Sequence, residues 1–511
     1  MTLPAPGSSD ALSVRDFIDR HSLHNPGAVF LIDPISGESL NFLQCAERVR
    51  QISGVICENG VQAGSPVAYA CSNSTETALI ILGILYGGHV ATAINLVAGE
   101  STISYVLEHS EAKMIFVDES SRDMIEPLIA GFSDPPDFLT FEQAGAFGAN
   151  QNANTLVSAD AEGLLMYTSG TTGLPKGVLL TQASLLAGGF NTAKAHELTS
   201  KDRGLCVLPF YHINAFCVSL MGSLVSGGSL VVPPRFSATK FWETIKQTNC
   251  TWFSVVPTQI SYLLHQTDVV EEYSGLNVER LRFGRSASAP LSPEMHQAFE
   301  ERFNIPIIET MGLTESAAQI LSNPLPPRER KIGSPGIPFG NDVVIADTEQ
   351  QEVPSGEEGE ILVRGPNILK GYLKNSQATA DTITSEGWLR TGDLGRMDTD
   401  GYVYVTGRLK ELIIKGGENI APREVDEALY THPDVIEAAA FGVECNDYGQ
   451  RVEAGVKLDE KSSASAEELV ELCKEKIGYF KAPDKVHILD DLPKGPSGKI
   501  QRRKLADIIN G

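Results

Sequence analysis

The chain has 511 residues, which is too long for one hydrophobic core and predicts two or three lobes. Apolar residues make up 42% and charged residues 21% of the chain, which is typical of a globular enzyme. The formal charge of −24 argues against nucleic acid or an anionic membrane as the main partner, because those partners select basic surfaces. A local basic site for a phosphorylated ligand is still compatible with that charge.

The eight cysteines are scattered and include no C-x-x-C pair, so we expect buried reduced thiols instead of disulfides or a zinc site. The N-terminus lacks the apolar core of a signal peptide. The uncharged stretches 77–99 and 204–234 are interrupted by glycine, proline and polar residues. We therefore expect each to be a buried helix followed by a strand, with no membrane span, in a cytoplasmic protein.

From about residue 12 to 370, short runs rich in Val, Ile and Leu alternate with helix-length amphipathic segments. We expect helices at 75–88 and 237–248, and buried strands at 65–71, 112–118, 228–233 and 250–257. This alternation predicts an α/β fold with a large N-terminal domain of layered, mostly parallel sheets.

After 358–365 the pattern changes to short strands and turns, followed by a compact tail. In the tail we expect a helix from Pro422, a second helix over 465–477, and strands at 435–443, 451–459 and 485–491. We place the boundary at 407–411. It divides the chain into a large domain over 1–407 and a small, mobile α+β domain over 408–511.

The stretch YTSGTTGLPKG at 167–177 combines hydroxyl residues, glycines and one lysine. It is not a Walker A loop, because Gly177 follows Lys176 where that motif needs Ser or Thr. Its glycines allow close backbone approach and Lys176 supplies a mobile charge, a combination that suits phosphate oxygens. A polar surface turn has the same composition, and this segment alone does not decide between the two interpretations.

Other stretches favour a nucleotide site. In ETMGLTES (309–316), Thr314 and Glu315 follow a strand-like run, and a carboxylate there can hold Mg²⁺ against phosphate oxygens. Asp393 in GWLRTGDLG (387–395) suits a ribose diol, although an ordinary turn aspartate has the same surroundings. The basic stretch LPKGPSGKIQRRKL (492–505) is typical of a solvated face, but Lys499 can instead reach into a site.

Together with PFYHINAF, GEILVRGPNILKGY and GRLKELIIKGGENIAPREVD, these stretches resemble the motifs of the adenylate-forming superfamily. That superfamily contains acyl-CoA synthetases, luciferases and the adenylation domains of peptide synthetases. The resemblance covers essentially the whole chain, and the seven motifs occur in the family's order. It implies a ligase that joins a carboxylic acid to AMP with release of pyrophosphate, and then passes the acyl group to a thiol. The implied cofactors are ATP, Mg²⁺ and CoA.

The resemblance also implies roles for individual residues. Thr314 would bind the α-phosphate, Glu315 would bind the metal ion, and the β,γ-phosphates would be held by Thr168, Ser169, Gly170, Thr171, Thr172, Gly173 and Lys176. The nucleoside would lie against Ala289, Glu309, Thr310 and Met311, with its ribose on Asp393 and Arg408. Many members carry a tyrosine at the Met311 position.

Lys499 would bridge the acid and the α-phosphate during adenylation only. Rotation about the hinge residue Lys410 would then withdraw it and bring Gly416 and Gly417 to the site, where they leave room for a pantetheine arm. His212 would lie near the reacting carboxylate, although a lone histidine is more often structural.

Three further stretches bear on which carboxylic acid is the substrate. RFSATKFW, LRFGRSASAPLSPE and LSNPLPP look most like the corresponding stretches of the oxalate–CoA ligases of plants and fungi. Those enzymes carry histidines where this chain has Asn214 and Ala318, which argues against oxalate itself. The polar set His212, Asn214, Arg285, Ser286 and Ser288 favours a small polar or doubly anionic acid of the sulfonated or dicarboxylic type. A purely structural role is equally compatible with the sequence: Ser286 and Ser288 can belong to a backbone turn, and Arg285 can support the pocket wall from outside the pocket.

Several alternatives stay open. The substrate can be a medium-chain or aryl acid, the acceptor can be a carrier protein instead of CoA, and a homodimer is not excluded. A nucleotide-binding scaffold without activity is disfavoured, because it would have no use for Lys499, Glu315 and Asp393. A dinucleotide dehydrogenase is disfavoured because no strand–G-x-G-x-x-G–helix unit is present.

Overall fold

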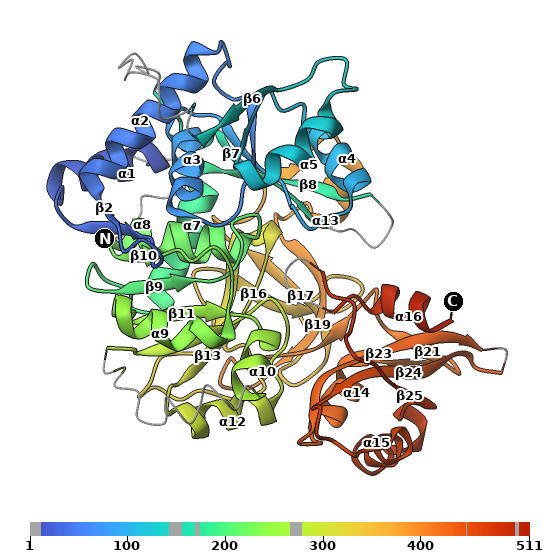
Figure 1. Ribbon diagram of the computed structural model, residues 1–511. Helices are drawn as coiled ribbons and strands as arrows, with labels where there is room; N and C mark the ends of the chain where they lie inside the picture. The colour runs from blue at the N-terminus through green and yellow to red at the C-terminus, as the bar shows by residue number, and fades with distance from the viewer. Residues whose placement is uncertain are drawn as a thin grey trace.

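The computed structural model describes residues 12–141, 143, 156–168, 174–265, 278, 280–445, 447–495 and 500–510. The described residues form a large N-terminal part with three sheets and a smaller C-terminal part with a fourth (Figure 1). The predicted α/β fold class is confirmed. In the described chain, no helix combines the length and apolar character that crossing a bilayer would require.

The first sheet has parallel pairing at its centre and helices on both faces. Its order is β18 (Gly371–Tyr372), β8 (Lys176–Thr181), β7 (Glu162–Thr168), β4 (Val90–Ala93), β3 (Pro66–Ala70), β5 (Met114–Val117) and β6 (Asp137–Thr140). Along β3, Val67 and Tyr69 face the core that contains α2 (Phe42–Glu58) and α3 (Thr75–Tyr86). Ala68 and Ala70 point the opposite way, toward α4 (Glu100–Ser110) and α5 (Glu119–Ile129) (Figure 1). Both sheet faces are therefore covered, as parallel strands require.

The second sheet follows the same principle. Its order is β15 (Ile337–Pro338), β14 (Ala318–Ser322), β13 (Ile307–Leu313), β12 (Phe283–Ser286), β11 (Trp252–Val255), β9 (Arg203–Cys206), β10 (Ser229–Val231), β1 (Val29–Ile32) and β2 (Ser39–Asn41). Phe253 of β11 packs in the core with α9 (Ala238–Thr248), α10 (Pro257–His265) and α12 (Pro293–Phe303). Trp252 faces the other core, which contains α1 (Val14–His24), α7 (Gln182–Ala195), α8 (Gly222–Ser226) and the π-helix η1 (Asn214–Met221).

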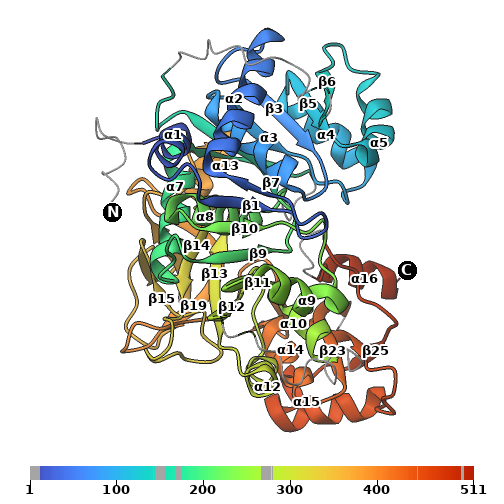
Figure 2. The ribbon, with the colours of Figure 1, turned by 60° about the vertical axis from the view of Figure 1, so that its left-hand side comes forward.

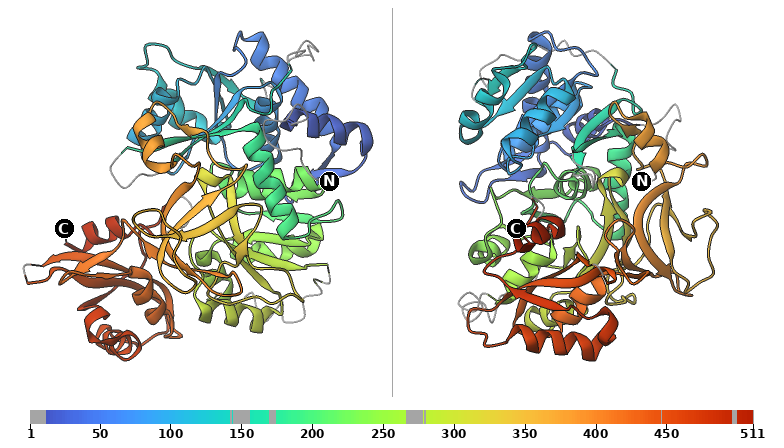
Figure 3. Two further views of the ribbon diagram at one scale, coloured as in Figure 1. Left: turned by 180° about the vertical axis from the view of Figure 1, so that it is seen from behind. Right: turned by 90° about the vertical axis from the view of Figure 1, so that its right-hand side faces the viewer.

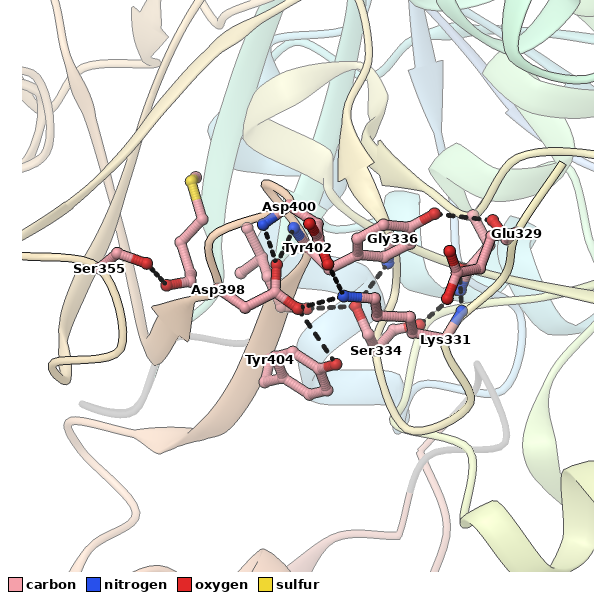
Figure 4. Close-up of polar contacts among 12 residues, drawn as sticks. Glu329, Lys331, Ser334, Gly336, Ser355, Asp398, Asp400, Tyr402 and Tyr404 are labelled. Atoms are coloured by element: carbon pink, nitrogen blue, oxygen red, sulfur yellow. Dashed lines mark hydrogen bonds and ion pairs between the residues drawn. The ribbon is translucent and has the colours of Figure 1, made fainter.

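The third sheet is antiparallel and has the order β16 (Asp342–Ala346), β17 (Gly359–Arg364), β19 (Leu389–Met397) and β20 (Val403–Arg408). The short helix α13 (Ser376–Thr382) precedes β19. A polar cluster ties the β19–β20 turn to the loop between β14 and β15 (Figure 4). There Lys331 Nζ lies 2.7 Å from Asp398 and 2.6 Å from Asp400, and Ser334 Oγ donates to the carbonyl of Val403 at 2.6 Å.

The C-terminal part has its own core. Its strands are β21 (Ile413–Lys415), β22 (Glu418–Ile420), β23 (Val435–Cys445), β24 (Gly449–Leu458) and β25 (Lys485–Ile488). Its helices are α14 (Pro422–Tyr430), α15 (Ala466–Lys481) and α16 (Arg502–Asn510). Figure 2 and the left panel of Figure 3 show this part to one side of the large part, and β23 packs against α10. The predicted boundary at 407–411 covers the last residues of β20 and the start of the connection to β21, and it stays a prediction.

Two expectations need correction. The stretch 204–234 begins within strand β9, and its first helical segment is a π-helix, so it is not simply a helix followed by a strand. All eight cysteines are free, but Cys57 is exposed and Cys445 is half-buried, whereas the other six are buried as expected. Cys57 lies near the end of α2, just beyond its buried residues Val55 and Ile56.

Candidate active site

The ends of the glycine-rich loop are held together by a hairpin. Thr168 at the end of β7 pairs with Lys176 at the start of β8, so the loop leaves and re-enters the sheet at one point. Beside it, Tyr167 Oη lies 2.8 Å from Nδ1 of His109 in α4, which anchors the base of the hairpin. The predicted phosphate ligands Ser169, Gly170, Thr171, Thr172 and Gly173 lie outside the described residues.

Glu315 and Lys176, predicted on separate motifs, both lie against one tyrosine. Tyr372 Oη donates a hydrogen bond to Glu315 Oε1 at 3.0 Å. Lys176 Nζ lies 5.1 Å from the centroid of the same ring, within cation–π range. Burial and the charge of Glu315 raise the pKa of Tyr372, which keeps its hydroxyl a donor. Tyr372 was not predicted as a site residue, although it is the last residue of the motif GEILVRGPNILKGY.

The turn that carries Thr314 and Glu315 has an unusual backbone. Ala317 and Ala318 follow it with φ values of 45° and 79°, a region that non-glycine residues rarely occupy. A side chain on Gly312 would put its Cβ 1.8 Å from the carbonyl oxygen of Ala318, so only glycine fits there. Such conformations persist where the surrounding structure fixes them and concentrate at functional sites.

Asp393 and Arg408 form an ion pair across β19 and β20, in which Asp393 is buried and Arg408 is half-buried. They are register partners, and Arg408 Nε lies 2.5 Å from Asp393 Oδ1. Burial alone would lower the pKa of Arg408, but the charges of Asp393, Glu411 and Glu315 outweigh it and raise that pKa. Glu315 therefore acts electrostatically on Arg408, and the structure brings the predicted metal and ribose residues into one region.

Glu309 and Thr310 lie on β13 beside Ser286 of β12. Thr310 Oγ1 donates to the carbonyl of Ser286 at 3.3 Å, and Glu309 Oε1 accepts from the backbone N–H of Leu291 at 3.2 Å. Burial raises the pKa of Glu309, and the charge of Arg423 partly offsets this effect. Met311, next along β13, is half-buried and pairs with Leu321 of β14.

A chain of polar side chains runs from the interior to the surface of the site. Arg285 Nη1 donates to Asn214 Oδ1 and to Ser254 Oγ, each at 3.1 Å. Ser254 Oγ also donates to Asn214 Oδ1 at 2.9 Å, and Asn214 Nδ2 donates to Ser288 Oγ at 3.4 Å. Ser288 is exposed and has a φ of 73°. His212 lies just before η1 and its carbonyl accepts from the N–H of Phe216 at 3.0 Å.

Arg285 is a buried cation. It is 1% exposed, and its Nε has no hydrogen-bond partner in the described structure. Among the residues that the structure describes, no carboxylate lies within ion-pair distance of Arg285. Burial lowers the pKa of Arg285 well below its usual range, to about 9. Arg285 thus fixes the position of Asn214 through a hydrogen bond, while no negative charge in the described structure compensates the charge of the guanidinium.

A cavity of about 110 Å³ lies between the two parts of the chain. One wall contains Ser288 and Ala289, and the other contains Arg423 of α14 together with Ile500 and Arg502. Lys499, the predicted catalytic lysine, lies outside the described residues.

Direct contacts join the two parts next to this cavity. Ser261 Oγ donates to the carbonyl of Ile436 at 3.0 Å, and Tyr262 Oη donates to Glu437 at 3.3 Å. Glu437 is also paired with Lys494 at 2.9 Å.

Gly416 and Gly417 lie apart from this cavity in the described structure. They have φ values of 61° and 86° in the turn of the β21–β22 hairpin, and both are exposed. The N–H of Gly416 donates to the carbonyl of Tyr448, within the C-terminal part. Lys410, the predicted hinge, is exposed between β20 and β21.

Comparison with known proteins identifies the family. A model described as AMP-binding enzyme matches residues 18–373, and one described as AMP-binding enzyme C-terminal domain matches residues 424–499. The chain belongs to the AMP-binding enzyme family. This family assignment confirms the predicted superfamily and reaction class, an AMP-forming acyl-CoA synthetase.

Individual relatives cover nearly the whole of this AMP-binding enzyme. Sulfoacetate–CoA ligase of Cupriavidus necator is 43% identical over 94% of each chain. Oxalate–CoA ligase of Arabidopsis thaliana is 36% identical over 89% of this chain and 91% of the relative. ATP-bound MatB from Rhodopseudomonas palustris has a TM-score of 0.88 and 28% identity, covering 97% of this chain and 100% of that one. For o-succinylbenzoate CoA synthetase from Bacillus subtilis with its acyl-adenylate, the TM-score is 0.84, the identity 28% and the coverage 96% and 97%.

Proposed function

We propose that this synthetase activates a small carboxylic acid bearing a second anionic group, of the sulfonated or dicarboxylic type, and transfers it to CoA. The observation that carries the proposal is Arg285, a fully buried guanidinium with no carboxylate partner among the described residues. A buried charge is costly unless an opposite charge compensates it. A bound dianionic acid would supply that charge.

The hydrogen bonds around Arg285 support the same substrate class. Asn214 Oδ1 accepts from both Arg285 and Ser254, so its Nδ2 is left to donate toward Ser288 and the open side of the site. A fatty acyl chain in this place would leave the charge of Arg285 uncompensated and its Nε, which has no partner in the described structure, without an acceptor, and both effects disfavour such a chain. The 43% identical sulfoacetate–CoA ligase, whose name specifies a doubly anionic acid, also supports the proposal.

In the first half-reaction, a carboxylate oxygen of the acid forms a bond to the α-phosphorus of ATP and pyrophosphate leaves. The hairpin ends Thr168 and Lys176 would hold the β,γ-phosphates, Thr314 the α-phosphate, and Asp393 with Arg408 the ribose. Such transfers depend mainly on positioned cations and donors. Ala289, Glu309, Thr310 and Met311 would surround the adenine, and His212 would lie near the reacting carboxylate.

Magnesium fits this site only with help from the nucleotide. In the described residues no group of three or more His, Cys, Asp or Glu side chains could hold a metal. Mg²⁺ in nucleotide sites commonly uses one or two carboxylates together with phosphate oxygens and water. Glu315 would be the protein ligand, and the ion would neutralise phosphate charge.

In the second half-reaction, the CoA sulfur forms a bond to the acyl carbonyl carbon and AMP leaves. We propose that the domain at 408–511 rotates about Lys410 between the steps, withdrawing Lys499 and presenting Gly416 and Gly417. The position of Ile500 beside Ala289, and of Gly416 beside Tyr448, supports assigning the observed arrangement to adenylation.

The proposal is tested by measuring AMP and pyrophosphate release over matched acids, with and without CoA. Sulfoacetate and malonate should give higher kcat/KM than propionate, butyrate and octanoate. A preference for octanoate or a cinnamate-like acid would reject the substrate class. Appearance of ADP and phosphate without AMP would reject the reaction itself.

A further inference from the structure

Tyr372 is held between the two segments that carry Lys176 and Glu315. On one side, β18 pairs with β8, with Gly371 opposite Leu179 and Tyr372 opposite Val178. On the other side, the N–H of Leu369 donates to the carbonyl of Glu315 at 2.8 Å. Asn367 Nδ2 also donates to the carbonyl of Ser316 at 2.6 Å. The strand that carries Tyr372 therefore cannot move relative to either segment without losing backbone hydrogen bonds.

The side chain of Tyr372 adds one contact to each segment. Its hydroxyl donates to Glu315 Oε1 at 3.0 Å, and the Lys176 ammonium lies 5.1 Å from its ring centroid. The hydroxyl occupies one oxygen of the carboxylate and so fixes which oxygen is turned away from the ring. The ring face limits where the flexible lysine can place its charge.

We propose that Tyr372 is a positioning residue that couples the phosphate-binding lysine to the metal-binding carboxylate. It orients Glu315 toward a cation and Lys176 toward the phosphates before ATP arrives, so that neither side chain has to be ordered on binding. This inference rests on the proposed roles of Lys176 and Glu315. It does not depend on which acid is activated.

Three substitutions distinguish the effect of each Tyr372 contact on ligand binding from an effect on the stability of the fold. Tyr372→Phe removes the hydroxyl and keeps the ring, whereas Tyr372→Leu removes both. Tyr404→Phe is the matched control, because Tyr404 Oη also donates to a carboxylate, Asp398, at 3.4 Å, within the cluster of Figure 4. The control contact lies in a cluster that contains neither Lys176 nor Glu315.

The readout is ATP binding by calorimetry without any acid, at a series of Mg²⁺ concentrations and in the absence of Mg²⁺. Tyr372→Phe should raise by about tenfold the Mg²⁺ concentration at which the increase in ATP affinity is half-maximal. This is the change expected from losing one hydrogen bond to a charged group. It should leave metal-free ATP binding within about twofold. Tyr372→Leu should in addition weaken metal-free ATP binding by about threefold or more, because Lys176 loses its orientation.

The proposal is overturned if Tyr372→Phe lowers only the melting temperature, or if Tyr404→Phe shifts the Mg²⁺ dependence equally. Glu315→Gln is measured alongside. If that variant leaves the Mg²⁺ dependence unchanged, Tyr372 cannot act through Glu315 and the inference is also wrong. A failure to find the acid substrate leaves these binding results unaffected, so the two failures can be told apart.

Discussion

Replacing Arg285 by methionine removes a buried charge while largely keeping the volume of the side chain. Burial lowers the pKa of Arg285 to about 9. Burying an ion without an opposite charge costs several kcal/mol, and this cost disfavours the charged folded state. The lost hydrogen bonds to Asn214 and Ser254 offset about 2 to 3 kcal/mol of that. We therefore expect the ligand-free variant to be as stable as the wild type or about 2 kcal/mol more stable near pH 7.

The pH dependence of this effect has a defined sign. Above about pH 9 the unfolded chain binds more protons at Arg285 than the folded protein does, because burial lowers the folded pKa. The destabilising effect of the Arg285 charge on the folded state is thus fully present below about pH 9 and diminishes as the pH rises above that value. The stability difference between variant and wild type should be constant from pH 6 to 8, measured by thermal denaturation.

The same substitution should impair the use of dianionic acids. Losing one partner of a buried ion pair costs about 3 to 5 kcal/mol, so kcat/KM for sulfoacetate should fall by about 100-fold or more. For propionate, which has no second anion, it should change by less than about tenfold.

Arg282→Met is the control, because Arg282 is paired with Asp202 at 2.6 Å. It should lower the melting temperature and leave the ratio of kcat/KM values for the two acids unchanged. The reasoning is refuted if Arg285→Met loses several degrees of stability and keeps the wild-type preference between the two acids.

Further variants test the other proposed roles. Lys499→Ala should slow pyrophosphate release by several orders of magnitude and leave thioester formation from supplied acyl-adenylate nearly intact. Gly417→Leu should slow thioester formation and leave pyrophosphate release nearly intact. Equal loss of both half-reactions in both variants would contradict the proposed rotation between the two steps. Ser288→Ala should reduce the kcat/KM ratio of malonate to butyrate about tenfold while the KM for ATP stays within about twofold, and an unchanged ratio would remove Ser288 from the acid site. Asp393→Ala should raise the KM for ATP about tenfold or more through loss of ribose hydrogen bonds, and an unaltered KM would exclude that role.

Local patterns were sufficient to predict most of the fold. The expected strand at 112–118 contains strand β5, and the expected helix beginning at Pro422 is α14. These features depend on hydrophobic periodicity and on Pro at the first helical position, both of which are properties of neighbouring residues. The π-helix at Asn214 was not foreseen, because an uncharged segment gives no polar face from which its periodicity could be read.

The motifs indicated candidate site residues, whose roles stay predictions, but they did not indicate the contacts among those residues. The motifs pointed to Glu315 and Lys176, yet Tyr372, which touches both, lies 57 residues beyond Glu315 in the chain. For Arg285, the sequence left pocket support and substrate binding equally open. Only the three-dimensional surroundings reveal a guanidinium that braces Asn214 and lacks a carboxylate partner within the described residues.

A competition experiment tests the central claim most directly. The enzyme is given ATP, Mg²⁺, CoA and an equimolar mixture of sulfoacetate, malonate, propionate, octanoate and cinnamate, and the CoA thioesters formed are quantified by mass spectrometry. The buried charge of Arg285 predicts that thioesters of the short acids with a second anionic group predominate, with AMP formed in equal amount. Predominance of octanoyl-CoA or cinnamoyl-CoA would contradict the proposed substrate class.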